Sequence, residues 1–574
     1  MHQANVTVAA RPNQSASWHS IDWRLVKSRV NNLRRRIYRA SVAGNTKKAG
    51  SLEKLMLKSM SNRLSAIRRV TQVNQGRNSP GIDKIVINTD KERRELLEKL
   101  AENDAYRVSP IRRVYIPKKN GKQRALGLPT ILDRCRQAVV KAALEPYWEA
   151  KFERCSYGFR PGRSPQDAIQ KIYCIARPGK SRRWVLEADI KGAFDNIDHD
   201  FLVKVVGNFP GREWIKAWLE AGVMEKDQVI PTTAGTPQGG LISPLLANIA
   251  LHGMEECLGI CYDSYGRIKL SSPYALVRYA DDSVVFAKTR EACQQAKEKI
   301  QTWLQARGLE LSEEKTSIAH MEEGFDFLGF HIKHYKASKR RQGIVMQSKP
   351  SRSSISSFKK QMVLEWKKGL SWSTKQVIEN LNPKIKGWTS YYRTGASQKT
   401  FSGLDHWMWK RQVWYSYRKH PSKSWQWRKK KYWGKIRGRN DQWVFTDKES
   451  EGESFLWKLG WTRAKRHILV KGGSSPDDPK LRAYWQERQA NQGRYLFKTR
   501  SILWRKQAGR CAVCMDKIDN GEGIEIHHLI PRKEGGKERI DNLAMLHVTC
   551  HRQVHSKAGR QTTGVSKLRE PYAG

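Results

Sequence analysis

The sequence has few acidic residues for its length and no long apolar run. Its 574 residues include 55 Asp and Glu against 107 Lys and Arg, so the formal net charge is +52. Many Lys and Arg usually mean a solvated surface, but an excess of this size would make an isolated globule repel itself. It therefore predicts a polyanionic partner, and nucleic acid is the obvious one.

The lack of long apolar runs bears on where the protein works. No stretch is long enough to span a bilayer, and the first residues, MHQANVTVAARPNQ, contain no apolar core of a signal peptide. We therefore expect no membrane partner and a location inside the cell. The absence of acidic residues before Asp22 leaves an organellar location open.

The cysteines do not form the pattern of a disulfide-rich protein. There are nine, an odd number, and they are scattered along the chain. This favours a reducing compartment over a disulfide framework. Only Cys511, Cys514 and Cys550 lie near clustered histidines, which indicates metal binding in that block.

A chain of this length is too long for one core, so we expect three or more domains. The apolar pattern predicts helices over residues 18–73 and 133–149, with short β segments and turns over 112–130. It also predicts a buried strand at 184–190 and a hairpin at 276–287. Helices mixed with hairpins in this way indicate a multidomain α+β fold rather than a parallel doubly wound sheet.

Three aspartates have the positions that a metal-dependent polymerase needs. Asp189 ends the predicted strand, and Asp281 and Asp282 lie at the bend of the predicted hairpin. Nucleotidyl transfer uses two Mg²⁺ ions, and Mg²⁺ prefers carboxylate oxygens. A strand end and a hairpin bend can be neighbours in space although they are far apart in sequence. The plainer alternative is an ordinary polar turn at the hairpin and a helix cap at Asp189.

The region after about residue 350 is rich in tryptophan and in basic residues. It holds 14 of the 21 tryptophans between Trp366 and Trp504, together with basic runs such as 428–431. Aromatic rings can stack on unpaired bases while cations meet phosphates, so this composition suits RNA. For any single tryptophan we favour the alternative, the core of a helical bundle. The basic residues between the tryptophans are the better candidates for RNA contact.

The C-terminal block is rich in both cysteine and histidine. Five of the 15 histidines lie between residues 527 and 555. Cys511-x-x-Cys514 and His547-x-x-Cys550 have the spacing of two knuckles that together form one tetrahedral structural Zn²⁺ site.

The remaining histidines of this block suit a second metal. His551 and His555 are four residues apart, so they share one face of a helix, and His527 could supply a third ligand. His528 would then serve as a general base, because imidazole exchanges a proton near neutral pH. The alternative is a purely structural zinc knob that binds DNA without cutting it.

Seven segments of the chain resemble those of the reverse transcriptases encoded by mobile group II introns, in the same order. They are RRVYIPKKNGKQRALGLPTILDRCRQAVV, SYGFRPGRSPQDAI, LEADIKGAFDNIDH, GTPQGGLISPLLANIAL, YADD, LELSEEKT and FDFLGF. Residues 382–407 resemble the thumb of this family, also called the maturase or X domain. The resemblance implies a right-hand polymerase with fingers, an antiparallel palm sheet and an α-helical thumb.

The resemblance also implies roles for residues of the polymerase site. Asp189 and Asp281 would be the principal Mg²⁺ ligands, with Asp282 beside them. Phe194 is placed like the aromatic gate that clashes with a ribose 2′-OH, and core packing is the alternative for this ring.

Four further residues would contact the nucleotide and the template. Lys118 and Arg124 match the fingers cations that grip the incoming dNTP, Arg as a planar fork and Lys as a point charge. Gln238 in PQGG matches the residue near the templating pair. Lys315 in SEEKT matches a lysine near the triphosphate, with a plain surface helix as the alternative.

The C-terminal block resembles an HNH nuclease, a small ββα-metal domain. HHLIP would be its first strand, GG its loop, NLAML the segment around the central Asn542, and CHRQVH its closing helix. The resemblance implies that Asn542 fixes the loop and orients the general base, His528. The other three histidines, His527, His551 and His555, would hold Mg²⁺ or a similar divalent ion that polarises the scissile phosphate.

These observations together predict the domain boundaries. We expect a basic N-terminal extension with the start of the fingers at 1–85, fingers and palm at 86–348, thumb at 349–445, a linker and DNA-binding segment at 446–500, the HNH domain at 501–560 and a tail at 561–574. The run GGSSPDDP at 472–479 is typical of a linker. The basic residues expected to contact DNA are Lys480, Arg482, Arg488, Arg494, Lys498 and Arg500.

The implied function is that of a group II intron-encoded protein with several activities. It would bind its intron RNA as a ribonucleoprotein, assist splicing, nick double-stranded target DNA, and copy the RNA from the nicked 3′ end with dNTPs. It would act in a bacterial cytoplasm, associated with the nucleoid, and a homodimer is compatible with the sequence.

Two alternatives remain open at the level of sequence. One is an RNA-binding splicing factor with idle enzymatic domains, and the intact YADD and HNH residues argue against it. The other is a reverse transcriptase of a different retroelement, and the tryptophan-rich thumb argues against that.

Overall fold

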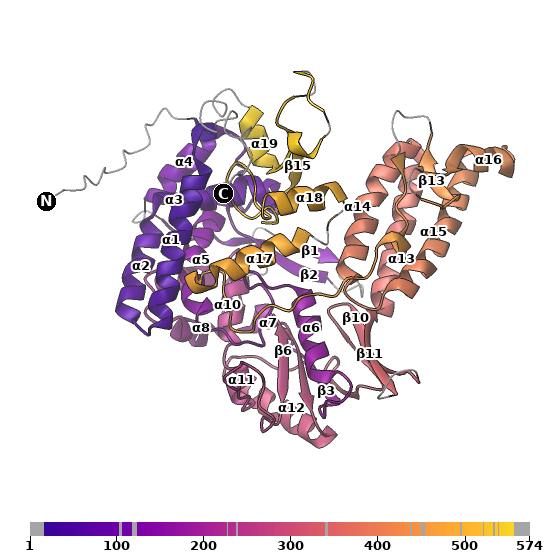
Figure 1. Cartoon of the computed structure of the whole chain (residues 1–574). Helices are drawn as coiled ribbons and strands as arrows, with labels where there is room; N and C mark the ends of the chain where they lie inside the picture. Colours follow the sequence, from indigo (N-terminus) through magenta and orange to yellow (C-terminus); the bar gives the residue numbers. More distant parts are fainter. Residues whose placement is uncertain are drawn as a thin grey trace.

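The computed structural model of the chain describes residues 17–102, 106–117, 123–226, 228–236, 239–338, 343–436, 439–448, 454–493, 496, 498–520, 522–531, 534–537 and 539–555. Figure 1 shows a body of helices and sheets with a helical lobe beside it. The C-terminal elements lie against the N-terminal helices, although they come from opposite ends of the sequence. Within the described ranges, no helix combines the length and the apolar character needed to cross a bilayer.

A four-stranded sheet forms the base of the body. Its strands run in the order β6 (Ala275–Tyr279), β7 (Asp282–Ala287), β3 (Trp184–Asp189) and β8 (Ser317–His320), and every pair is antiparallel. Alternate residues of β6 and β7 enter two different cores, so both faces of the sheet are covered. Helix α12 (Arg290–Gln305) covers one face and α6 (Pro165–Ala176) the other. The predicted strand at 184–190 and the hairpin at 276–287 are thereby confirmed.

A second sheet lies above the first. It has the order β2 (Gln123–Leu128), β1 (Ile111–Pro117), β4 (Val223–Glu225) and β5 (Gln228–Ile230). β1 and β2 form an antiparallel hairpin, whereas β1 pairs with β4 in parallel. The β segments predicted at 112–130 are therefore present, and their partner β4 comes from a distant part of the chain.

Helices from the first quarter of the chain pack side by side on the body (Figure 1). They are α1 (Trp23–Val42), α2 (Thr46–Lys58), α3 (Met60–Arg68), α4 (Asp90–Ala101) and α5 (Ile131–Glu149). Each begins at a residue whose side chain accepts a hydrogen bond from the first turn, as Asp22 does from the Leu25 amide. The predicted helices over 18–73 and 133–149 are confirmed.

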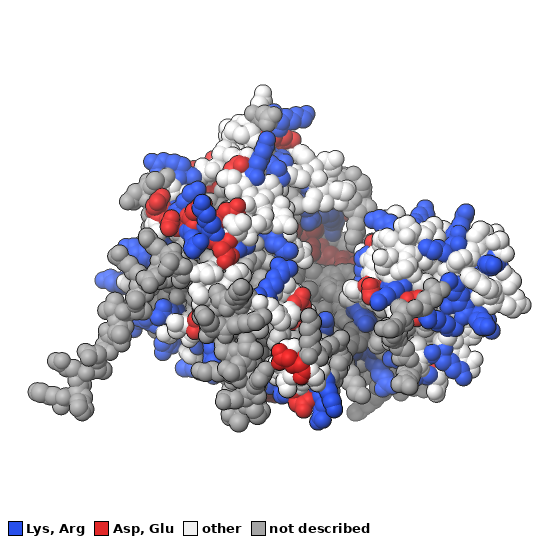
Figure 2. Space-filling view, turned by 90° about the horizontal axis from the view of Figure 1, so that it is seen from above, with Lys and Arg blue, Asp and Glu red and all other residues white. Residues whose placement is uncertain are grey.

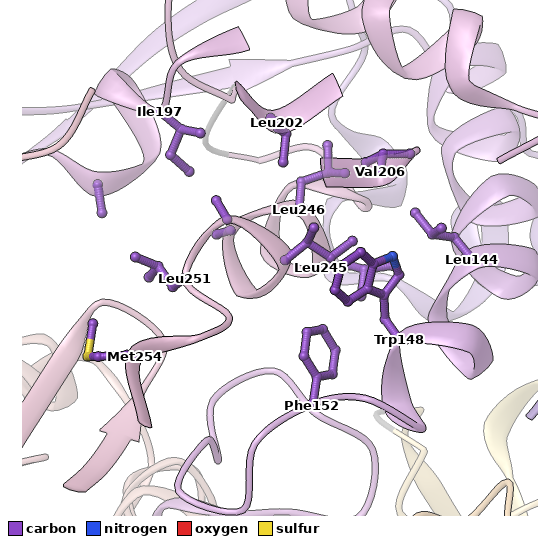
Figure 3. Packing of buried hydrophobic residues seen from close by; sticks show 14 of the residues in the cluster. Leu144, Trp148, Phe152, Ile197, Leu202, Val206, Leu245, Leu246, Leu251 and Met254 are labelled. Carbon is purple, nitrogen blue, oxygen red and sulfur yellow. The ribbon is translucent and has the colours of Figure 1, made fainter. Parts of the chain in front are cut away.

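One large apolar core joins these helices to the central sheet. In Figure 3, Trp148 of α5 lies beside Phe152 and faces Leu245 of α10 (Ser243–Ala250). Leu202 and Val206 of α8 (His199–Val206) belong to the same cluster. The remaining helices of the body are α7 (Ala193–Asn196), α9 (Arg212–Glu220) and α11 (Met254–Cys257).

The lobe beside the body is mostly helical. It contains α13 (Arg352–Lys368), α14 (Thr374–Tyr392), α15 (Gln398–Lys419) and α16 (Trp425–Tyr432), with the short strands β12 (Trp433–Gly434), β13 (Val444–Asp447) and β14 (Ser454–Phe455). A three-stranded sheet, β9 (Phe325–Phe327), β10 (Phe330–Lys336) and β11 (Ile344–Pro350), leads into it. Trp366 and Trp433 are buried in its core, as expected for most of these rings, but Trp409, Trp427 and Trp443 are exposed.

The C-terminal part contains α17 (Arg482–Gln492), α18 (Lys498–Lys506), β15 (Ile524–His528), β16 (Leu543–His547) and α19 (Val548–His555). Its apolar side chains share one core with the N-terminal helices: Leu503, Trp504 and Leu546 belong to the same cluster as Trp23 and Ile67. The nuclease-like block is therefore packed against the body through a shared apolar core.

The expectation of a linker at 472–479 is wrong. Ser474, Ser475 and Asp477 are buried, and Asp477 accepts hydrogen bonds of 2.9 and 2.7 Å from the Arg34 guanidinium of α1. Arg34 also donates to Glu145 at 2.8 Å. The polar composition that suggested a linker is explained by this buried ion-pair network, which satisfies the charges inside the protein.

Two candidate active sites

The hairpin between β6 and β7 brings the three predicted aspartates together. Asp282 pairs with Asp189 across β7 and β3, and it also pairs with Tyr279 across the hairpin. Only Ala280 and Asp281 remain in the turn, and Ala280 has φ +58°, a left-handed conformation typical of tight hairpins. All three carboxylates therefore lie at one edge of the sheet.

A glycine supports this turn from below. A Cβ atom at Gly158 would lie 2.3 Å from the backbone nitrogen of Ala280, so no larger residue fits without moving the turn. The buried Arg278 donates to the Ala280 carbonyl at 3.2 Å and to Asn248 at 3.2 Å, and Asn248 in turn donates to the Gly158 carbonyl at 2.8 Å. The turn is therefore held by a buried hydrogen-bond network.

The three carboxylates repel one another, so binding of a cation between them would be electrostatically favourable. Burial, followed by the charges of Asp281 and Asp189, raises the pKa of Asp282 to about 7. Burial and Asp189 also raise the pKa of Asp281, while Arg124 and Lys315 oppose that shift. Lys315 donates to Asp189 Oδ2 at 2.6 Å. This donor set of hard oxygen atoms fits Mg²⁺, whose charge would relieve the repulsion.

Phe194 lies beside the hairpin in a cluster of rings. It is half-buried on α7, its ring centroid is 6.4 Å from that of Phe159, and Phe159 is 6.5 Å from Tyr279. Phe159 is 50% exposed and has φ +58°. Sequence reasoning did not single out Phe159, because an exposed aromatic residue in a left-handed turn carries no periodic signal.

The predicted nucleotide-binding residues are placed as follows. Arg124 is exposed on β2 and close enough to act on the charge of Asp281. Lys118 and Gln238 lie outside the described residues. The described residues on either side of positions 237 and 238 lie close to other segments, because the Thr236 amide donates to the Phe194 carbonyl and a Cβ at Gly239 would lie 2.3 Å from the Gly127 carbonyl oxygen.

The second site begins with four buried ligands. One donor atom from each of Cys511, Cys514, His547 and Cys550 lies within 4.8 Å of the others. His547 Nε2 is 2.9 Å from the Lys517 carbonyl, which leaves Nδ1 to face the thiols, with Cys514 Sγ at 3.4 Å. Three thiols and one imidazole fit a structural Zn²⁺ site.

A residue of the N-terminal helices supports this group. Arg68 at the end of α3 donates to Cys550 Sγ at 3.0 Å and to Thr549 Oγ1 at 2.9 Å, and its guanidinium lies 4.6 Å from the Trp23 ring centroid. Lys27 of α1 forms an ion pair of 3.2 Å with Asp516. Nothing in the sequence points to Arg68, because its partner is 482 residues away.

A second group of ligands lies on the same hairpin and helix. It consists of His527 of β15 and of His551 and His555 of α19. One ring nitrogen from each of these histidines lies within 4.8 Å of the other two. His551 Nδ1 lies 2.6 Å from Glu525 Oε2, a contact that orients the ring toward a metal. Burial, followed by the neighbouring imidazoles, lowers the pKa of His527 to about 4, so this ring is neutral and ready to bind a cation.

The predicted base and its supporting asparagine lie next to this group. His528 follows His527 on β15, is half-buried, and pairs with Leu543 of β16. Asn542 Oδ1 accepts from the Ile530 amide at 2.7 Å, and its Nδ2 donates to the Ile530 and Lys537 carbonyls at 3.1 and 2.9 Å. These contacts fix Ile530 and Lys537 against Asn542, close to the end of β15 at His528.

The residues predicted to contact DNA fall into three groups. Lys480, Arg482 and Arg500 are exposed, whereas Arg494 and the side chain of Lys498 lie outside the described residues. For Arg488 the expectation is wrong: it donates to the buried Asp167 at 2.8 Å and to the Ile468 carbonyl at 2.7 Å. Figure 2 shows further Lys and Arg spread over the lobe.

Comparison with known proteins places four domain types along this chain. Residues 116–332 match the reverse transcriptase (RNA-dependent DNA polymerase) family, and residues 18–100 match the N-terminal domain of reverse transcriptase. Residues 355–433 match the group II intron maturase-specific domain, and residues 511–557 match the HNH endonuclease family.

Individual relatives are similar over part of the chain. The group II intron-encoded protein LtrA of Lactococcus lactis subsp. cremoris is 32% identical over 335 residues, which cover 48% of this chain and 55% of LtrA. Protein YkfC of Escherichia coli is 33% identical over 309 residues, 47% of this chain and 80% of YkfC. Maturase-like protein 1 of Euglena gracilis is 26% identical over 366 residues, 63% of this chain and 74% of that protein. The chain thus spans about half the length of LtrA.

Proposed function

The chain belongs to the family of group II intron-encoded proteins, and from this premise we propose that it copies intron RNA into DNA at a nicked target. The observation that carries the proposal is the convergence of Asp189, Asp281 and Asp282 on one hairpin edge in a chain that also holds a complete His/Cys nuclease-like group. The body would form the fingers and palm, and the lobe of α13–α16 the thumb or maturase domain.

In the polymerase step, the aspartates bind and orient the reacting groups. Mg²⁺ held by Asp189, Asp281 and Asp282 would activate the primer hydroxyl and neutralise the triphosphate. Lys315, now paired with Asp189, is positioned to meet the negative charge of the triphosphate once a metal takes that carboxylate. Arg124 would grip the phosphates from β2, and Lys118 and Gln238 would complete the substrate contacts.

The sugar of the nucleotide would be selected by Phe194. Its position beside Phe159 and Tyr279, at the metal-binding edge, supports this role. We expect Phe194→Val to raise incorporation of ribonucleotides relative to deoxynucleotides by about 10–100-fold, because the ring no longer clashes with the 2′-OH. The measurement is the ratio of the kcat/KM values for rNTP and dNTP in single-nucleotide extension. An unchanged ratio would mean that Phe194 only packs.

The nuclease-like group would supply the primer. His528 would remove a proton from the attacking water, Asn542 would hold the loop in place, and His527, His551 and His555 would bind a divalent ion next to the scissile phosphate. The Cys511, Cys514, His547 and Cys550 set would hold Zn²⁺ and fold the domain. A nick made in one strand of double-stranded DNA would give the 3′ end that the polymerase extends.

The lobe and the basic surfaces would hold the intron RNA and the target DNA. The maturase-specific match over 355–433 and the charge of +52 support an RNA-bound protein that assists splicing. The relatives named above come from two bacteria and from Euglena, and we propose a bacterial cytoplasm as the place of action. A splicing factor with idle enzymatic domains is the second candidate, and the complete carboxylate and histidine sets argue against it.

The test is extension of a DNA primer on an RNA template by the full chain with dNTPs. We expect cDNA synthesis that requires Mg²⁺ and stops when a chelator removes it. A second observation concerns the DNA that flanks the reading frame, which should fold as a group II ribozyme. Absence of cDNA synthesis with Mg²⁺ present would reject the polymerase proposal, and a flank without a ribozyme would reject the splicing role.

A further inference from the structure

A pocket in the lobe has no role in either candidate active site. It lies between one face of α15 and residues 441–445 and 456–461, and its volume is about 710 Å³, within the range of small-ligand sites. The residues of α15 that line it recur every three or four positions, so they form one stripe of the helix. The lining consists of Gln398, Ser402, Asp405, His406, Met408, Trp409, Gln412, Asp441, Trp443, Phe445, Leu456, Trp457, Lys458, Gly460 and Trp461. We call it the tryptophan pocket.

Hydrogen bonds hold the two walls of the tryptophan pocket in fixed positions. Asp405 of α15 accepts from the amides of Leu459 and Gly460 at 2.6 and 2.8 Å. A Cβ at residue 460 would lie 2.9 Å from the Asp405 carboxylate, so glycine permits this approach. Trp461 Nε1 donates to Asp441 at 2.9 Å. The pocket is therefore formed before any ligand binds.

The rim of the pocket leaves large aromatic faces open to solvent. Trp409 is 37% exposed and Trp443 is 39% exposed. Each is backed by a near-parallel ring: His406 lies at 19° to Trp409, and Trp425 lies at 13° to Trp443. Flat rings with this much exposed surface can accept a further ring by stacking.

Cations lie over the aromatic walls. Lys429 Nζ is 4.5 Å from the Trp443 ring centroid, and the Arg439 guanidinium is 3.9 Å from that of Trp461. An apolar peptide or a lipid chain would gain nothing from these charges. An unpaired nucleotide would use both features, because its base stacks on indole and its phosphates meet Lys and Arg.

We infer that the tryptophan pocket binds one unpaired base of an RNA, with the base stacked against Trp409 or Trp443 and the flanking phosphates near Lys429 and Arg439. This inference deepens the proposed function, since it rests on RNA binding by the lobe. It adds a defined site, a ligand of stated chemistry and the rings that contact it. Recognition of a single extruded base would let the lobe read a loop or bulge of folded RNA.

The first experiment measures the affinity of the full chain for a fluorescent single-stranded RNA of about 12 nucleotides. It is done at about 0.3 M salt, where phosphate contacts are weakened and stacking persists. We expect Trp409→Ala to lower affinity about 10-fold and Trp409→Phe, which keeps a ring, to restore most of it. The matched control is Trp427→Ala, because Trp427 of α16 is equally exposed, at 36%, but does not line the pocket.

The second experiment locates the base. The same RNA carries one 5-iodouridine, which cross-links to aromatic side chains under ultraviolet light, and the protein is mapped by mass spectrometry. Cross-links at Trp409 or Trp443 support the inference. Equal affinity of Trp409→Ala and Trp427→Ala overturns it, as does equal binding of an oligomer with abasic central positions, which would leave the pocket to a peptide.

The outcomes separate this inference from the proposed function. If the wild-type chain extends a primer but Trp409→Ala binds RNA as the wild type does, only the pocket assignment fails. If the wild-type chain neither extends a primer nor binds RNA, the proposed function fails first.

Discussion

The two candidate active sites prepare for metals in opposite ways. At the β6–β7 hairpin, three carboxylates crowd together, and the pKa values of Asp281 and Asp282 are raised by burial first and then by repulsion between the carboxylates. In the C-terminal block, the group of His527, His551 and His555 consists of imidazoles, and burial lowers the pKa of His527 so that this ring stays uncharged. The first site gains electrostatic energy when a cation binds, whereas in the second His527 is already neutral before a cation binds.

The two sites also differ in what holds them. The hairpin is supported by its own domain, through Gly158, Asn248 and Arg278. The nuclease-like block is supported by a different part of the chain, the N-terminal helices. Arg68 of α3 contacts Cys550, and the N-terminal helices and the block share one apolar core. The geometry of the hairpin site should therefore be insensitive to the C-terminal block, while the group of Cys511, Cys514, His547 and Cys550 should depend on the N-terminal helices.

The largest expected effect comes from removing a carboxylate of the first site. Asp281→Ala should lower cDNA synthesis by about 10⁴-fold, because loss of metal stabilisation of about 6 kcal/mol corresponds to that factor. RNA affinity should remain nearly unchanged, since the RNA is held by basic surfaces. Primer extension and RNA binding are measured on the same preparation.

The control for this variant is Asp326→Ala, an exposed aspartate of β9 outside the site. It should extend primers as the wild type does. Polymerisation retained by Asp281→Ala would show that the hairpin carboxylates do not bind the catalytic metals, and the contrast between the two sites would lose its basis.

The next effect tests whether the two sites act independently. His528→Ala should slow nicking of double-stranded DNA by about 10³-fold, the size of a general-base contribution. Extension from a primer that already has a 3′ end should continue at the wild-type rate, which serves as the internal control for folding. Nicking at the wild-type rate would mean that His528 is not the base.

The sequence was sufficient to predict which residues lie together in each candidate metal site. Residue type and spacing determine ligand chemistry. The pairs Cys511-x-x-Cys514 and His547-x-x-Cys550 therefore predicted that these four residues lie together, and in the structure they do. The alternating apolar pattern likewise located β3 and the hairpin, because burial on a strand has a period of two residues.

Contacts between distant segments could not be predicted in the same way. Asp477 with Arg34, Arg488 with Asp167 and Cys550 with Arg68 join residues 443, 321 and 482 positions apart. A polar segment that docks through buried ion pairs has the same composition as an exposed linker or a DNA-binding surface. The errors at 472–479 and at Arg488 both come from this ambiguity.

A smaller effect is expected where the zinc group meets the N-terminal helices. Arg68→Met keeps the length of the side chain but removes the hydrogen bonds to Cys550 and Thr549. Loss of such support typically lowers metal affinity 10–100-fold, so we expect about that loss of Zn²⁺ in competition with a chelator. The matched control is Lys27→Met, which breaks the ion pair with Asp516 between the same two regions but contacts no ligand. Equal zinc retention in both variants would show that the dependence on α3 is only steric.

The smallest expected effect uses pH to separate the sites. The pKa of Asp282 is raised to about 7 mainly by burial and then by Asp281 and Asp189, so below pH 7 this carboxyl holds a proton that Mg²⁺ must displace. The Mg²⁺ concentration for half-maximal primer extension should thus rise about fivefold between pH 7 and pH 6 and level off above about pH 8. The pKa of His527, about 4, keeps that ring neutral throughout this range, so it contributes no such slope to nicking.

Asp282→Asn is the informative variant, because it removes the titrating proton and should flatten the Mg²⁺ profile. A profile that keeps its slope in this variant would assign the proton to another group, and the two sites would then differ in their ligands but not through the charge of Asp282.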